Sequence, residues 1–185
     1  MRVVAVIMLS VFFAGCSIIR KEPYRETCYF DLGQPPQQIH AEGVGVTIGA
    51  ISAQSPYDDA RMVFRMSDNQ LKIDEFTRWS AAPPQLLRKR LILSNISIPS
   101  DKLKFCQCDL DAEILQFEAD CEKKMAFITF AAVFSKSPQC VYLCEKYHEK
   151  VPIGERVTGE SVAKAMSVAV DQAVAKLAKD ISQLK

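Results

Sequence analysis

The sequence predicts an α+β domain in which a mixed, mostly antiparallel sheet carries two helices packed on one face. Two patterns support this class. Apolar and polar residues alternate with a period of two over several segments, which is typical of strands that bury one face. Two other segments, 83–94 and 158–184, repeat apolar residues at helical spacing. The chain has 185 residues, which is enough for one domain with a real core.

The first two predicted strands are short or rich in glycine. Residues 28–32 form a strand candidate that ends at Gly33 and the prolines of the following loop. A second strand is expected at 44–50, where every other residue is apolar. Its opposite face is almost bare, so another backbone can approach it closely. The residues of that bare face are Gly43, Gly45, Thr47 and Gly49.

Residues 61–74 predict a β-hairpin. Apolar and polar side chains alternate on both sides of a group of turn-forming residues at 67–70. Phe76 then breaks the parity of the apolar positions. This change indicates a β-bulge before Trp79.

The segment 83–94 predicts a helix that begins with prolines, which the first helical turn tolerates. Its central basic run, Arg88, Lys89 and Arg90, is expected to point largely outward as a solvated face. The stripe expected to face the core consists of Leu86, Leu87, Leu91 and Ile92.

Three further strands are expected at 103–117, 125–134 and 140–151, with a turn at 120–123. The middle strand is nearly continuous in apolar residues, as a central strand should be. Thr158 is expected to cap the last helix. The buried stripe of that helix is expected to consist of Val162, Met166, Ala169, Ala173, Leu177, Ile181 and Leu184.

Charge and motif content argue against several function classes. With 23 basic and 22 acidic residues the net charge is +1, so no basic face for nucleic acid is expected. His40 and His148 lie outside any catalytic or metal-binding motif. Asp58, Asp109 and Asp111 fit turns and a solvated strand face better than an acid/base pair. The sequence therefore predicts no catalytic residue, no metal site and no enzyme.

The N-terminus has the features of an export signal. An apolar run follows Arg2 and ends at Phe13-Ala14-Gly15-Cys16, and it is too short to span a bilayer. This end resembles the lipobox of bacterial lipoproteins, with Phe13 in place of the usual leucine. The resemblance implies cleavage before Cys16, a diacylglycerol on its thiol and an acyl chain such as palmitate on the new amine. Three acyl chains suffice to anchor a protein stably in a membrane. A soluble secreted protein without lipid is the alternative.

The lipobox divides the chain into a signal peptide at 1–15, a lipidated tether at 16–27 and a folded domain at 28–185. Ser17 follows the lipidated cysteine. By similarity to enterobacterial lipoproteins, serine rather than aspartate at this position implies transfer to the outer membrane, with the domain facing the periplasm.

The remaining six cysteines form an even set, as expected for disulfides in an oxidising compartment, and 15 pairings are open. Cys106 and Cys108 should point to the same face of their strand, and Cys140 and Cys144 should also share a face. This arrangement favours disulfides that join a cysteine of the first pair to a cysteine of the second. Cys121, expected at a hairpin tip, could bond to Cys28 or to a second molecule. A zinc site is the alternative, although the spacing is not that of a zinc knuckle. The disulfide candidates are Cys28, Cys106, Cys108, Cys121, Cys140 and Cys144.

Four short motifs lie between residues 57 and 87. They are Tyr57-Asp58-x-x-Arg61-Met62-Val63-Phe64-Arg65, Asp68-Asn69-Gln70-Leu71, Phe76-x-Arg78-Trp79 and Pro83-Pro84-Gln85-Leu86-Leu87. Together they resemble the ABC-type transport auxiliary lipoproteins, a family that includes the lipoprotein of the paraquat-inducible intermembrane transport system. The similarity covers roughly residues 24 to 183, and Phe64 stands where the family often has tyrosine. The motif residues to which it assigns a structural role are Tyr57, Arg61, Arg65, Arg78 and Trp79.

The resemblance implies a non-enzymatic accessory or docking component of an ABC-type or mammalian-cell-entry-type intermembrane lipid transport system, anchored in the outer membrane. The implied partners are a periplasmic protein of the mammalian-cell-entry type and an inner-membrane permease, and a homo-oligomeric ring would suit such a role. A stand-alone periplasmic lipoprotein that binds lipid or a small molecule is the main alternative. The third alternative is an envelope-stabilising protein whose copies are joined by intermolecular disulfides through Cys121.

Overall fold

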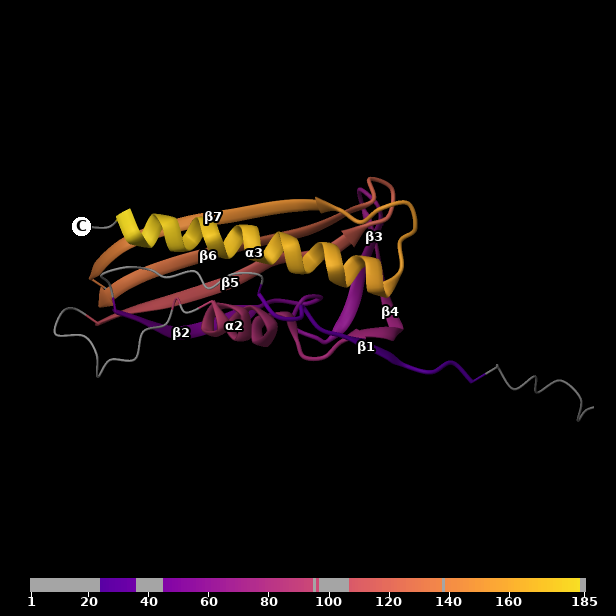
Figure 1. The fold of residues 1–185 in the computed structure, drawn as a ribbon, viewed down its shortest axis with the longest axis horizontal. Helices are drawn as coiled ribbons and strands as arrows, with labels where there is room; N and C mark the ends of the chain where they lie inside the picture. Colours follow the sequence, from indigo (N-terminus) through magenta and orange to yellow (C-terminus); the bar gives the residue numbers. More distant parts are fainter. Residues whose placement is uncertain (1–23, 36–44, 95, 97–106, 138, 184–185) are drawn as a thin grey trace, which may run out of the picture.

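The computed structural model describes residues 24–35, 45–94, 96, 107–137 and 139–183. They form a seven-stranded sheet with two helices on one face, which confirms the predicted α+β class (Figure 1). In this part of the chain no helix is both long and apolar enough to cross a bilayer. The elements are β1 (Cys28–Phe30), β2 (Gly45–Ala53), β3 (Arg61–Ser67), β4 (Gln70–Trp79), α2 (Pro83–Leu93), β5 (Gln107–Asp120), β6 (Met125–Ser137), β7 (Cys140–Pro152) and α3 (Gly159–Gln183).

The sheet is built around β5. The strand order is β1-β4-β3-β5-β6-β7, and β2 also pairs with β5. The first part of β5 pairs in parallel with β2, from Gly45 beside Gln107 to Ala53 beside Ile114, and its last residues pair in parallel with β3. Strands β2 and β3 therefore follow one another along the same edge of β5. On the other edge, β5, β6 and β7 form an antiparallel meander.

The predicted bulge before Trp79 is present. The pairing of β3 with β4 shifts between Arg61, which faces Arg78, and Val63, which faces Ile73. The side chain of Asp74 holds the extra residues, because its Oδ1 accepts hydrogen bonds from the backbone N–H groups of Phe76 (2.9 Å) and Thr77 (3.3 Å). The bulge thus lets the hairpin keep Trp79 buried while Phe76 stays partly exposed.

Helix α3 supplies most of the core on the helical side of the sheet, where it lies across β6 and β7 (Figure 1). The predicted cap is confirmed, since the backbone N–H of Ser161 donates to Thr158 Oγ1 at 3.2 Å. The predicted stripe is also confirmed within the described residues, and Leu184 lies outside them. Its buried members are Val162, Met166, Ala169, Ala173, Leu177 and Ile181.

Two predictions for α2 were wrong. Arg90 was expected to point outward but is 1% exposed, and Ile92 was expected in the core but is 50% exposed. The helical period explains both, because Arg90 comes one turn after Leu86 and so stays on the buried stripe, whereas Ile92 falls on nearly the opposite side. A basic residue could occupy the stripe only because α3 provides polar partners for it.

Candidate functional site

The motif residues Tyr57 and Arg65 meet on one buried carboxylate, Glu118 of β5. The Tyr57 hydroxyl, in the loop between β2 and β3, donates to Glu118 Oε2 at 2.5 Å. Arg65 of β3 binds both oxygens, through Nε to Oε1 at 2.5 Å and through Nη2 to Oε2 at 3.1 Å. Glu118 is 1% exposed, so these donors replace the water that the carboxylate loses on folding.

The environment fixes the protonation of the two donors. Burial raises the pKa of Tyr57, and the hydrogen bond to Glu118 raises it further. The hydrogen bond to Glu118 also raises the pKa of Arg65. Tyr57 is therefore a neutral donor and Arg65 a cation over the whole physiological range.

A chain of hydrogen bonds continues from Glu118 across two more strands. Gln116 Nε2 donates to Glu118 Oε1 at 2.7 Å, and Thr129 Oγ1 of β6 donates to Gln116 Oε1 at 3.1 Å. His148 Nδ1 of β7 lies 2.7 Å from Thr129 Oγ1. Because Thr129 uses its one proton toward Gln116, His148 Nδ1 must be the donor in this contact. Neutral His148 therefore has its proton on Nδ1 and a lone pair on Nε2.

The motif residue Trp79 braces β5 from the other face. Trp79 is 2% exposed, and its ring meets Phe117 edge-on, with centroids 5.2 Å apart and planes at 72°. Phe117 and Glu118 are consecutive in β5, so their side chains point to opposite faces of the sheet. Residues from three different motif positions thus hold two neighbouring residues of the central strand.

The other two motif residues make only local contacts. Arg61 Nε forms an ion pair with Asp59 Oδ1 at 3.1 Å, and Arg78 Nε donates to the carbonyl oxygen of Glu75 at 3.1 Å. Arg61 and Arg78 face each other across the β3–β4 pair. The structure therefore divides the predicted motif into a brace around β5 (Tyr57, Arg65 and Trp79) and a pair of arginines that order the hairpin.

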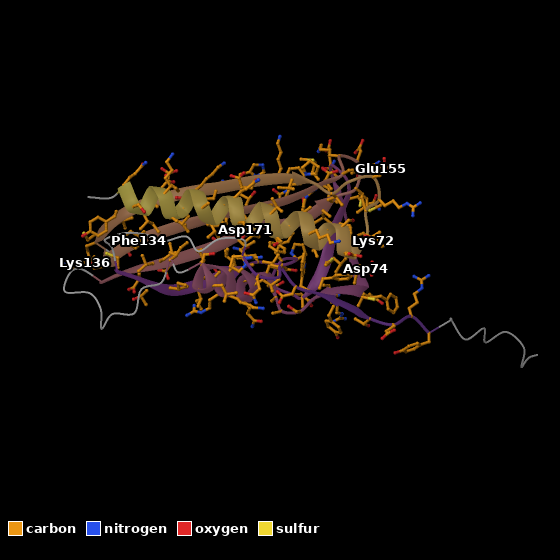
Figure 2. The ribbon with its side chains drawn as sticks, in the orientation of Figure 1. Lys72, Asp74, Phe134, Lys136, Glu155 and Asp171 are labelled. Atoms are coloured by element: carbon orange, nitrogen blue, oxygen red, sulfur yellow. The ribbon has the colours of Figure 1, made fainter. Side chains whose placement is uncertain are left out.

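A second buried polar cluster surrounds Arg90, and the sequence analysis missed it. Arg90 Nη2 donates to the carbonyl oxygen of Leu32 at 2.5 Å and to Ser167 Oγ at 2.8 Å. Arg90 Nη1 lies 3.3 Å from Asp171 Oδ1, midway along α3 (Figure 2). Burial lowers the pKa of Arg90 and raises that of Asp171, while each charge favours the other. The signal for this cluster was the one-turn spacing between Leu86 and Arg90.

A groove of about 460 Å³ lies next to this cluster, between the segment after β1 and the first half of α3. Leu32 and Ser167, which bind Arg90, also line the groove. Phe30 and Val168 add apolar surface to it. Charged residues also line it, among them Asp31, Glu160 and Lys164.

The structure separates several of the disulfide candidates. Strand β6 lies between Cys108 on β5 and Cys144 on β7, which places their Cα atoms two strand spacings, about 10 Å, apart. A disulfide needs less than about 7 Å. Cys140 starts the same strand β7 and is separated from Cys108 in the same way. Cys106 and Cys16 lie outside the described residues, so a bond through Cys106 stays a prediction.

The alternative bond between Cys28 and Cys121 does not fit the register. Cys28 pairs with Thr77 of β4, whereas the backbone N–H of Cys121 donates to Arg65, which pairs with Leu71 of the same strand. Six residues of strand, about 20 Å, separate these two points. Burial and the charge of Asp120 also raise the pKa of the Cys121 thiol, which lowers its reactivity.

The described histidine, cysteine and acidic side chains show no group of three that could hold a metal ion. His40 lies outside the described residues, and His148 belongs to the chain of hydrogen bonds that ends at Glu118. The acidic residues Asp109 and Asp111 lie on β5, with one exposed and the other half-buried.

Comparison with known proteins identifies the fold. The chain matches no family model and no curated protein. It is similar to the crystal structure of an uncharacterised protein, with a TM-score of 0.67 and 16% identity over 85% of this chain and 99% of the other. It is also similar to a crystal structure from Xanthomonas campestris assigned to the family DUF330, with a TM-score of 0.61 and 17% identity over 84% of this chain and 91% of the other. At these identities the similarity shows a shared fold.

Proposed function

We propose that this protein is a lipid-anchored, non-enzymatic accessory component of an intermembrane lipid transport system, at the periplasmic side of the outer membrane. The observation that carries the proposal is the convergence of Tyr57, Arg65 and Trp79 on Phe117 and Glu118 of β5. Motif positions that are far apart in the sequence act as one brace, which is the behaviour expected of a family motif with a structural role. We therefore propose that the domain is rigid and that a partner protein docks onto it, as the family resemblance implies.

The predicted anchor sets the range of that docking. Eleven residues lie between Cys16 and Cys28, the first residue of β1, and the twelve Cα-to-Cα steps of an extended chain span at most about 40 Å. Three acyl chains would hold one end of this tether in the membrane. The domain would then meet a periplasmic protein of the mammalian-cell-entry type, whose inner-membrane permease lies at the other end of the conduit.

The alternative, a stand-alone lipoprotein that binds lipid or a small molecule, is favoured by one observation. The groove beside Leu32 and Val168 has about 460 Å³, which is within the range of small-molecule sites. An acyl chain is the ligand that its apolar lining would suit.

One experiment separates the two functions. The full chain is expressed in its own envelope with a photo-reactive cross-linker, then purified in mild detergent and examined by mass spectrometry for acylation at Cys16, cross-linked proteins and bound lipid. The docking function predicts acylated Cys16 and a cross-link to a mammalian-cell-entry-type protein without stoichiometric lipid. Lipid without that partner would favour the alternative, and an unacylated, freely diffusing chain would overturn both.

The matched control variants are Cys16→Ser and Cys28→Ser. Cys16→Ser should release the chain from the membrane and abolish the cross-link, whereas Cys28→Ser should retain both, because Cys28 is an exposed residue of the edge strand β1. Non-reducing gels of the same samples test the third function, a network of intermolecular disulfides, which requires a dimer that disappears in Cys121→Ser.

A further inference from the structure

Strand β7 is the longest open edge of the sheet within the described residues. Strand β7 runs for 13 residues, pairs with β6 along its whole length and has no strand on its other side (Figure 1). Because β6 occupies only one of its two edges, every second residue of β7 directs its backbone N–H and C=O groups outward. Its outward N–H and C=O groups are therefore available to another strand.

Two of the other open edges are protected by side chains, and the outer edge of β1 is only three residues long. On β2, the guanidinium of Arg88 donates to the carbonyl oxygens of Gly49 at 2.7 Å and Ile48 at 3.1 Å. On β4, Asp74 occupies backbone N–H groups at the bulge, and Arg78 occupies the carbonyl oxygen of Glu75. Such devices hinder edge-to-edge pairing on β2 and β4.

We propose that β7 is a docking site for an extended acidic segment of a partner protein, which adds to the sheet as a further strand. This deepens the proposed docking function by naming the surface and the chemistry of its partner. Strand addition uses main-chain hydrogen bonds for affinity and alternate side chains for specificity.

The basic side chains of β7 favour a partner segment with acidic side chains. Lys146, His148 and Lys150 alternate along the strand and are exposed on the face away from α3. Their neighbours on β6 are Ala131, Thr129 and Phe127, so β6 offers no acidic side chain to offset the charge. An added strand with acidic residues at alternate positions would place each beside a basic residue of β7.

The other face of the added strand would meet a groove. A depression of about 490 Å³ runs between β7 and the last turns of α3, and Glu145, Glu149, Lys176 and Lys179 are among the residues that line it. Its floor is fixed, because the Tyr147 hydroxyl donates to Asp180 Oδ2 at 2.9 Å and Lys176 pairs with Glu149. Every second side chain of the partner segment would enter this polar groove.

The same charges disfavour a second copy of this chain as the occupant. An antiparallel pairing of two β7 strands about a two-fold axis would place like faces side by side. The basic residues Lys146 and Lys150 would then lie among basic residues, and the acidic residues Glu145 and Glu149 among acidic ones. Like charges directly opposite one another destabilise a strand pair.

The test uses the full chain in mild detergent and two capped octapeptides, one of alternating glutamate and valine and one of alternating lysine and valine. Fluorescence anisotropy should show at least tenfold tighter binding of the glutamate peptide, and amide hydrogen exchange should slow within 140–152 and not in β2 or β4. The double variant Lys146→Glu with Lys150→Glu should reverse the preference. The matched control Arg25→Glu with Lys72→Glu changes the net charge equally near β4 and should retain the wild-type preference.

Three outcomes would overturn the proposal. They are absence of binding, protection outside 140–152, and equal peptide preference in the two double variants. A fourth, concentration-dependent protection of 140–152 without peptide, would assign the edge to a second copy instead. The peptides need neither the lipid anchor nor the transport partner, so failure here leaves the proposed docking function to be judged by its own experiment.

Discussion

Tyr57 and Glu118, 61 residues apart in the chain, are joined by a 2.5 Å hydrogen bond in which the tyrosine hydroxyl donates to the carboxylate. This contact ties the loop between β2 and β3 to the central strand. Arg65 binds the same carboxylate from β3, so both ends of the segment 57–65 are fixed on β5. The loop crossing from β2 to β3 is thereby held against the sheet at the place where β5 changes its partner.

Replacing Tyr57 by phenylalanine should destabilise the domain by about 1–3 kcal/mol, because the buried Glu118 Oε2 would lose one of its two donors and keep only Arg65 Nη2. Urea unfolding of the full chain in detergent measures the change. Tyr29→Phe is the control, since Tyr29 is 66% exposed and its loss of a hydroxyl should leave the unfolding midpoint unchanged. Equal effects from the two variants would contradict the role of the Tyr57 hydroxyl.

The chain of hydrogen bonds from Glu118 predicts the tautomer of His148. In the neutral imidazole the proton should reside on Nδ1, because Thr129 Oγ1 accepts from it. Nitrogen-15 NMR of the histidine ring distinguishes the two tautomers. Thr129→Val removes the acceptor and should reduce the Nδ1-protonated fraction. A wild-type spectrum dominated by protonated Nε2 would show that the chain has the opposite polarity.

Arg90→Met should destabilise the protein by about 3 kcal/mol, because the half-buried Asp171 would lose its cation and the carbonyl oxygen of Leu32 a donor. Adding Asp171→Leu should recover part of the loss, since an apolar pair can replace a buried ion pair. Lys89→Met is the neighbouring control and should cost no more than about 1 kcal/mol, because the Lys89–Asp31 pair is exposed. If the losses of stability of Arg90→Met and Asp171→Leu simply add in the double variant, the two side chains are not energetically coupled and the prediction is wrong.

Asp120 should give the domain an acid-dependent component of stability. Burial raises its pKa, but hydrogen bonds from the backbone N–H (2.7 Å) and ammonium (3.1 Å) of Lys123 outweigh this and hold the pKa below the ordinary 3.8. A lowered folded pKa contributes stability above the unfolded pKa, and this is lost as the pH falls through the folded value.

Asp120→Asn should therefore lower the urea midpoint at neutral pH, and the difference from wild type should shrink as the pH falls below about 4. Asp68→Asn is the control, because the Asp68 side chain is 90% exposed and should show little difference at any pH. A gap between Asp120→Asn and wild type that stays constant down to pH of about 2 would contradict the assignment.

The elements that were predicted well depend on residues close together in the sequence. The Thr158 cap needs only Ser161 three residues later, and the bulge before Trp79 shows itself in the parity of a single strand. The error on α2 has the opposite origin, since the side of a helix that faces the core depends on distant residues that lie across from it. Arg90 reads as a surface residue until Asp171 and Ser167 are placed beside it.

The sequence by itself determined the fold class and the approximate positions of the strands and helices, because these are encoded in local spacing. It also predicts a lipid anchor and, through the family resemblance, the motif positions Tyr57, Arg65 and Trp79. Only the tertiary structure decided that those three residues meet on β5, that β6 separates Cys108 from Cys144, and that β7 forms the longest open edge of the sheet. The physical reason is that strand order brings together residues far apart in the chain, and no local pattern fixes which strands become neighbours.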